Sequence, residues 1–177
     1  MRWAVVYATG EGQTARIATA LAERLRAHGH TVGVHEVRRV GSAVALDGVD
    51  RVVVAGSIHL GRFARRLVRW CGAHAEGLAR CRAVLVTVSL TAAGDDPAEW
   101  SGLRTIVERF GAETGWHART IHHLPGRLAY ARYDPLTRWV MHRIARAHGL
   151  TAAGGGDVEL TDWEAVRRLG DGLAAAP

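Results

Sequence analysis

The chain has 177 residues, of which 48% are hydrophobic and 23% charged, so it can bury a full-sized core and is expected to form one domain over residues 1–177. Two cysteines, Cys71 and Cys81, are too few for a disulfide framework, and no apolar run approaches the roughly 20 residues that span a bilayer. The formal net charge is +6, all 23 basic residues are arginines, and this excess of guanidinium groups favours anionic partners.

Short β-rich runs alternate with longer helical patterns along the chain, which is typical of a parallel sheet covered by helices on both faces. We expect strands at residues 2–8, 31–37, 51–57, 83–89 and 117–122. We expect helices over residues 14–28, 62–75 and 97–110, and a last helix that begins at residue 161. The sequence therefore predicts an α/β fold with a doubly wound, five-stranded parallel sheet.

Apolar spacing and end signals support the first and last of these helices. Ile17, Leu21 and Leu25 recur at four-residue spacing and place one apolar face toward a core. At the start of the last helix, Thr161 and Glu164 have the spacing of a capping box, in which each side chain bonds the other residue's backbone N–H. Both patterns predict helices that pack on the sheet.

Residues 124–157 exceed the ordinary connection of about 2 to 6 residues and predict an insert near the fifth strand. Asp134 followed by Pro135 is typical of a helix start. Residues 134–148 carry an apolar stripe that includes Trp139, beside arginines and histidines. We predict a basic amphipathic helix here. Packing on the domain and binding to an anionic membrane surface both remain open for it.

A run of small, hydroxyl-bearing and polar residues follows the first strand: Thr9, Gly10, Glu11, Gly12, Gln13, Thr14 and Ala15. Small residues let the backbone curl tightly, and hydroxyl groups together with free N–H groups at a helix start favour a phosphate group. It is not a Walker loop, because the chain has no lysine, and the third glycine of the dinucleotide fingerprint is missing. We interpret the run as a phosphate-binding loop, with a plain strand-to-helix turn as the alternative.

Two further loops follow the third and fourth predicted strands, and parallel sheets bind ligands outside the carboxyl ends of their strands. The first loop comprises Ser57, Ile58, His59, Leu60 and Gly61. The second comprises Ser89, Leu90, Thr91, Ala92, Ala93 and Gly94. Free backbone groups in such loops can meet the edges of a flat heterocycle. One phosphate loop and two ring loops together indicate a mononucleotide site.

On these motifs the sequence resembles the flavodoxin-like family, and within it the menaquinone-dependent protoporphyrinogen dehydrogenases of bacterial haem synthesis. The residues that carry the resemblance cover nearly the whole chain: Tyr7, Gly12-Gln13-Thr14, Gly56-Ser57-Ile58, Ser89-Leu90, Arg132-Tyr133 and Thr161-Asp162-Trp163-Glu164. The resemblance implies a flavodoxin-like fold that holds FMN without a covalent bond. It implies a phosphate site at residues 9–15 and an isoalloxazine site between residues 57–61 and 89–94.

The resemblance also implies an enzyme that removes hydride equivalents from a porphyrinogen and passes electrons to menaquinone, with the flavin carrying the redox chemistry. Propionate groups of such a substrate would find partners among Arg62, Arg127, Arg132 and Arg138, because arginine binds carboxylates through paired hydrogen bonds. No catalytic residue is assigned. Leu60 departs from the pattern, since related proteins often place an aromatic side chain there against the flavin.

The sequence leaves other functions open. A flavodoxin-type electron carrier, or another FMN-dependent quinone reductase, is the main alternative, although carriers of this fold are usually acidic. Nucleic acid binding ranks last, because aromatic stacking positions are not interleaved along a basic groove. The ten histidines show no zinc-binding spacing, so we expect no metal. The N-terminus lacks a signal-peptide pattern, and we expect a cytoplasmic protein, with peripheral attachment to the inner face of the cell membrane left open.

Overall fold

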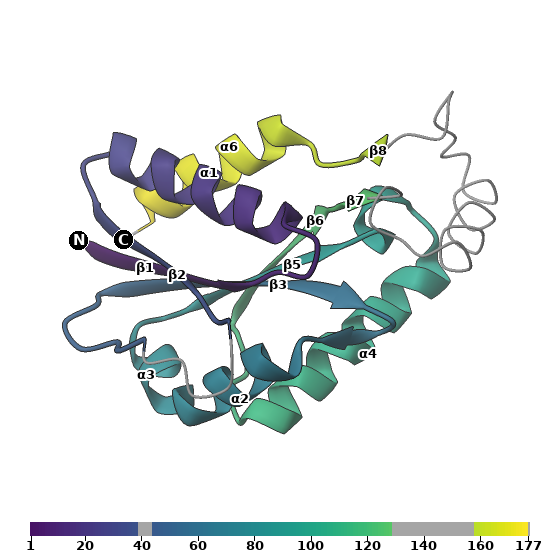
Figure 1. The fold of residues 1–177 in the computed structure, drawn as a ribbon, viewed down its shortest axis with the longest axis horizontal. Coiled ribbons are helices and arrows are strands. Elements are labelled where there is room, and N and C mark those ends of the chain that lie inside the picture. Colours follow the sequence, from purple (N-terminus) through teal and green to yellow (C-terminus); the bar gives the residue numbers. More distant parts are fainter. Residues whose placement is uncertain (39–43, 129–157, 177) are drawn as a thin grey trace.

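The computed structural model describes residues 1–38, 44–128 and 158–176. Its centre is a β-sheet with helices on both faces, and strands and helices alternate along the chain (Figure 1). The predicted α/β, doubly wound architecture is confirmed.

Five parallel strands cross the sheet in the order β2-β1-β3-β5-β6. They are β1 (Arg2–Ala8), β2 (Thr31–Glu36), β3 (Arg51–His59), β5 (Val84–Ser89) and β6 (Thr120–Pro125). Because β1 lies between β2 and β3, the strand order reverses there, and open sheets bind ligands at such a point. The register sets Ala8 opposite Gly56 and Ser57 opposite Val88, so the carboxyl ends of β1, β3 and β5 share one edge.

Helices cover both faces of this sheet (Figure 1). One face carries α1 (Gln13–Ala27) and α6 (Trp163–Ala175). The other face carries α2 (Arg65–Ala73), α3 (Ala75–Arg80) and α4 (Pro97–Thr114). None of the helices in the described ranges has both the length and the apolar content needed to cross a bilayer.

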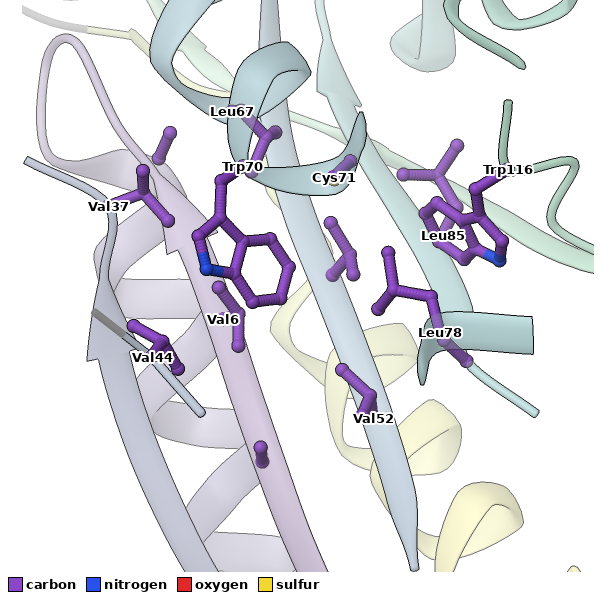
Figure 2. Packing of buried hydrophobic residues seen from close by; sticks show 14 of the residues in the cluster. Val6, Val37, Val44, Val52, Leu67, Trp70, Cys71, Leu78, Leu85 and Trp116 are labelled. Atoms are coloured by element: carbon purple, nitrogen blue, oxygen red, sulfur yellow. The ribbon is translucent and has the colours of Figure 1, made fainter. Parts of the chain in front are cut away.

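Alternate side chains of the strands build two separate cores. Val5 belongs to the buried cluster under α1 and α6, whereas its neighbour Val6 belongs to the cluster under α2, α3 and α4. In the second cluster, Trp70 of α2 packs with Val6 and Val52 (Figure 2). Cys71 is buried in the same cluster and is free, as expected of a small apolar side chain.

The segment after β3 differs from the prediction of one helix over residues 62–75. β4 (Arg62–Phe63) pairs antiparallel with the end of β3, and α2 begins only at Arg65. The two-residue turn between β3 and β4 consists of Leu60 (φ 48°) and Gly61 (φ 68°). Two successive positive φ angles are what a type I′ hairpin turn requires, and the leucine gives no sequence signal for them.

α4 is longer than predicted, and the prediction that it stops before Gly111 is wrong. The helix runs to Thr114 and ends at Gly115, whose φ of 68° is the left-handed conformation that glycine favours at a helix end. Gly111 serves packing instead, because a β-carbon there would lie 2.6 Å from Nδ1 of His117. The added turn delays β6, which begins at Thr120 rather than at residue 117.

The last helix begins at Trp163, and the predicted capping box is wrong. The carboxylate of Asp162 caps the helix by accepting hydrogen bonds from the backbone N–H groups of Glu164 (2.9 Å) and Ala165 (3.0 Å). The Thr161 hydroxyl donates instead to the backbone carbonyl oxygen of Pro125 (2.9 Å). A long-range contact to β6 therefore displaces the local cap.

A two-stranded antiparallel sheet joins β7 (Arg127–Leu128) to β8 (Val158–Glu159). These strands pair across the interval 129–157, which lies outside the described residues. The predicted helix at 134–148 and the predicted substrate residues Arg132 and Arg138 fall within that interval.

Candidate functional site

A pocket of about 530 Å³ lies at the carboxyl ends of β1, β3 and β5, and its volume is typical of small-molecule sites. All three predicted loops line it. The lining residues are Thr9, Glu11, Gln13, Thr14, Ser57, Ile58, His59, Leu60, Gly61, Val88, Ser89, Leu90, Thr91, Ile106, Gly126 and Arg127. The structure thus brings together three loops that lie up to about 80 residues apart in the sequence, as the sheet-edge argument predicts.

Some predicted residues lie beside this pocket rather than on its wall. They are Gly10, Gly12, Ala15, Ala92, Ala93 and Gly94. Of the predicted substrate arginines, Arg127 lines the pocket and Arg62 lines a neighbouring cleft. Sequence reasoning missed Gly126, which follows β6 and donates its N–H to the carbonyl oxygen of Ser89 (3.1 Å). The strand-order rule could have found it, because the carboxyl end of β6 reaches the same edge.

A hydrogen bond between two of its own residues closes the phosphate loop. The backbone N–H of Gly12 donates to Oγ1 of Thr9 (2.9 Å), and Gly12 has a φ of 94°, which only glycine adopts at low cost. A guanidinium N–H of Arg66 donates to the backbone carbonyl oxygen of Thr9 (2.6 Å) and fixes the loop from α2. α1 then starts without a side-chain cap. Its first N–H groups, which have no partner within the helix, are available to an anion.

Thr14 places a buried polar atom, its hydroxyl oxygen, beside the pocket. The residue is 1% exposed and lines the pocket, yet its buried hydroxyl has no hydrogen-bond partner among the described residues. Leaving such a group unsatisfied costs about 1–3 kcal/mol. An acceptor bound in the pocket would remove that cost.

The side chain of Gln13 is held by hydrogen bonds to residues at and just after β8. Its side-chain Nε2 donates to Oε1 of Glu159 (2.7 Å) and to Oγ1 of Thr161 (2.7 Å), so its amide is engaged with the β8 region. Arg16 pairs with the other oxygen of Glu159 (2.7 Å) and lies over the ring of Trp163, 4.7 Å from its centroid. Only the backbone N–H of Gln13 remains for a phosphate, and the side chain instead anchors α1 to β8.

The first ring loop folds back over the phosphate loop. A β-carbon placed at Gly10 would lie 3.6 Å from Nε2 of His59, so the imidazole lies against that glycine. Gly56, just before the loop, is required by packing, because a β-carbon there would lie 2.6 Å from Leu67. Leu60 is fully exposed at the rim of the pocket. The apolar side chain at the tip of the turn is thus open to a second molecule.

The second ring loop contains a short 3₁₀ turn (Thr91–Ala93) and is held by α4. The indole N–H of Trp100 donates to the carbonyl oxygen of Gly94 (2.9 Å), and the Trp100 ring meets the His123 ring edge-on at 5.3 Å. Burial of the ring, and next the charge of the neighbouring His122, lowers the pKa of His123 below its ordinary value. Its Nδ1 lies 2.7 Å from the buried hydroxyl of Thr87. These contacts with α4 and β6 hold the second ring loop in position.

The model of the flavodoxin domain family matches residues 4–152, which is most of the chain. The chain belongs to the flavodoxin family. Solved flavodoxins share the fold: one from Streptococcus pneumoniae superposes with a TM-score of 0.54 at 18% identity and covers 99% of both chains. A flavodoxin from the Archaea superposes with a TM-score of 0.54 at 15% identity, covering 98% of this chain and 96% of its own.

Curated relatives match over nearly the full length. A protein from Leishmania major, named protoporphyrinogen IX dehydrogenase [quinone], is 24% identical over 98% of this chain and 74% of its own. An Escherichia coli K12 protein of the same name is 25% identical over 98% of this chain and 95% of its own. The flavodoxin fold implies a flavin mononucleotide. The Thr14 hydroxyl, which no described residue bonds, and the uncapped start of α1 fit its phosphate group.

Proposed function

We propose that this flavodoxin-family protein is an FMN-dependent oxidoreductase that oxidises protoporphyrinogen IX and passes the electrons to menaquinone in haem biosynthesis. The observation that carries the cofactor proposal is the Thr14 hydroxyl, which lines the pocket in the uncapped first turn of α1 and has no hydrogen-bond partner in the described part of the chain. The names of the relatives at 24–25% identity support the substrate and the quinone acceptor.

The protein's own groups would position the reactants. We assign the phosphate to the loop 9–15, where the first N–H groups of α1 and the Thr14 hydroxyl would donate hydrogen bonds to it. Residues 57–61 and 89–94 would flank the ring. Bound FMN would supply two-electron transfer, which amino acid side chains do not provide. Val88 and Ile106 line the same pocket and would exclude water from the ring.

The substrate would need cationic partners for its carboxylates. Arg127 lines the pocket next to Gly126 and would hold one propionate at its mouth. Arg62 and the two arginines outside the described residues, Arg132 and Arg138, remain proposed partners on sequence grounds. Leu60, exposed at the rim, offers an apolar contact to a flat substrate or to a quinone ring.

Two measurements test the function in order. The purified protein should be yellow, or should take up FMN on incubation and gain thermal stability from it. FMN-loaded protein should then convert protoporphyrinogen to fluorescent porphyrin with a menaquinone analogue as acceptor. If the protein does not bind FMN, the proposed dehydrogenase function and the alternative function as an FMN-dependent electron carrier both fail.

A flavodoxin-type electron carrier is the second candidate, because the solved structures that share the fold are flavodoxins. An FMN-bound protein that shows no porphyrinogen oxidation above autoxidation, yet exchanges electrons with a redox partner, would favour it. Another FMN-dependent quinone reductase would show quinone reduction with a different donor. The porphyrin fluorescence assay separates the dehydrogenase from the other two functions, and quinone reduction with a different donor separates those two from each other.

Peripheral membrane binding is proposed for residues 134–148, which lie outside the described residues, on their basic and apolar pattern alone. Changing Trp139→Asp should reduce the fraction of protein that sediments with vesicles containing anionic lipid. Vesicles of neutral lipid are the control for charge. An unchanged bound fraction in the variant would remove the membrane proposal.

A further inference from the structure

A second cleft, of about 440 Å³, lies between the start of α2 and the facing side of α4. Four guanidinium groups surround it, from Arg62, Arg65, Arg69 and Arg109. We call it the arginine cleft. α2 and α4 lie on the same face of the sheet (Figure 1), and they approach closely at Gly72, where a β-carbon would lie 3.7 Å from the carbonyl oxygen of Thr114. The cleft lies nearer the start of α2.

The arginine cleft has a large excess of positive charge. Glu113 is the acidic residue that lines it, and its Oε1 lies 3.9 Å from Nε of Arg109. Within residues 1–38, 44–128 and 158–176, no acidic side chain forms an ion pair with Arg62, Arg65 or Arg69. α2 also begins with arginine and has no acidic residue in its first turn, although a cation there opposes the helix dipole. A bound anion would relieve both effects.

The floor of the cleft is apolar. Phe63 and Phe110 are 6% and 3% exposed, and their rings lie with centroids 4.5 Å apart. Val68 and Ile106 are half-buried beside them. Cations above an aromatic and aliphatic floor match an organic carboxylate with an apolar body better than they match inorganic phosphate.

The cleft adjoins the candidate flavin pocket. Ile106 lines both, and the Leu60–Gly61 turn stands between them. A guanidinium N–H of Arg109 donates to the carbonyl oxygen of Gly61, so the cleft side also holds the turn in place. A flat molecule at the pocket mouth could therefore extend its side arms over the turn and into the cleft.

We propose that the arginine cleft binds the carboxylate arms of a dicarboxylate electron donor whose ring system reaches the flavin pocket across the Leu60–Gly61 turn. The proposal rests on the proposed function for the identity of the donor. It assigns Arg65 and Arg69 as donor-binding residues, which the sequence did not single out. Arginine suits this role because its planar fork pairs with a carboxylate through two hydrogen bonds.

The test is a binding measurement that needs no turnover. Protoporphyrin IX and its dimethyl ester are titrated into FMN-loaded protein in detergent micelles, and binding is followed through the porphyrin absorption band. The double variant Arg65→Gln/Arg69→Gln should bind the free acid about tenfold or more weakly, with ester binding unchanged. The control Arg104→Gln/Arg119→Gln removes the same charge from exposed arginines that line neither cleft nor pocket, and it should bind both ligands like the wild type.

Unchanged affinity for the free acid in the double variant overturns the proposal, as does equal weakening in the control or with the ester. FMN affinity and the thermal midpoint report whether each variant is folded. If the double variant does not fold, Arg65→Lys replaces it, since lysine keeps the charge and loses the paired geometry, and it should also weaken the acid selectively.

Porphyrinogen turnover separates this inference from the proposed function. If the wild-type protein oxidises protoporphyrinogen and the double variant has the same KM, the proposed function stands and the donor-binding role of the arginine cleft is contradicted. Wild-type protein that binds the free acid through Arg65 and Arg69, yet gives no oxidation above autoxidation, keeps the cleft and removes the function.

Discussion

The Thr14 hydroxyl has opposite effects on stability and on ligand affinity. Changing Thr14→Val keeps the shape and deletes a buried hydroxyl that has no partner within the described ranges, so the ligand-free protein should be at least as stable as the wild type. FMN binding should weaken by about 1–3 kcal/mol, because the phosphate loses a donor. Thr14→Ser, which keeps the hydroxyl, is the control. Fluorescence titration of FMN and thermal unfolding without ligand check both signs; equal FMN affinity in the valine variant would contradict the assignment.

Leu60 combines backbone strain with full exposure. A non-glycine residue in the left-handed region costs about 1–2 kcal/mol, and asparagine tolerates that region better than leucine. Leu60→Asn should therefore raise the free energy of unfolding by up to about 1 kcal/mol and lower turnover with an apolar quinone. Leu60→Ala keeps the strain and removes the contact, so it should lower turnover without the gain in stability. Urea unfolding and quinone reduction rates measure the two effects.

At the scale of a helix, α4 contains two glycines whose substitutions should differ in sign. A β-carbon at Gly102 would meet nothing within 4 Å, so Gly102→Ala should stabilise the protein by about 1 kcal/mol through helix propensity. At Gly111 the same atom would lie 2.6 Å from His117 Nδ1, and Gly111→Ala should destabilise. Urea unfolding of the two single variants compares them within one helix. Equal stabilisation by both would show that His117 moves freely aside.

Helices α1 and α6 are joined by a charge cluster that predicts acid sensitivity. Hydrogen bonds from His28 and then Arg24 lower the pKa of Asp171 below its ordinary value of 3.8. A lowered carboxyl pKa stabilises the fold at pH values above 3.8, and this stabilisation is lost as pH falls through the folded-state pKa. Asp171→Asn should therefore flatten the loss of stability on acidification below about pH 5. Urea midpoints measured against pH test this, with Asp95→Asn on an exposed loop as the control.

At the scale of the whole molecule, the features that follow local rules could be predicted from the sequence. Strand periodicity predicts the bounds of β1 and β5 to within one residue. The rule that ligands bind at the carboxyl ends of parallel strands predicts that three loops distant in the sequence share one pocket. Features that depend on distant partners could not be predicted. Thr161 is drawn from its cap position by Gln13 and Pro125, and Gly111 is required by His117.

The arginine cleft escaped sequence reasoning for the same reason. Its residues come from β4, α2 and α4, and the α4 residues lie about 40 positions after the others in the sequence. The sequence also predicts a start for α2 that is too early. The Leu60–Gly61 turn that separates the cleft from the pocket was also hidden, since leucine does not signal a positive φ. Spatial neighbours on two helices leave no spacing pattern in a single sequence.

The pairing of β7 with β8 creates a position at which this fold can accept an inserted segment. Leu128 and Val158 are paired in the backbone register at the two ends of the interval 129–157, so the chain leaves and re-enters the described structure at neighbouring positions. Loop closure is cheap when the ends are already held together, and insertions at such a point leave the host sheet intact. Evolution could lengthen, shorten or exchange that stretch as a cassette. Because the Glu159 carboxylate accepts hydrogen bonds from Gln13 and Arg16, any segment inserted here would also be linked to the start of α1.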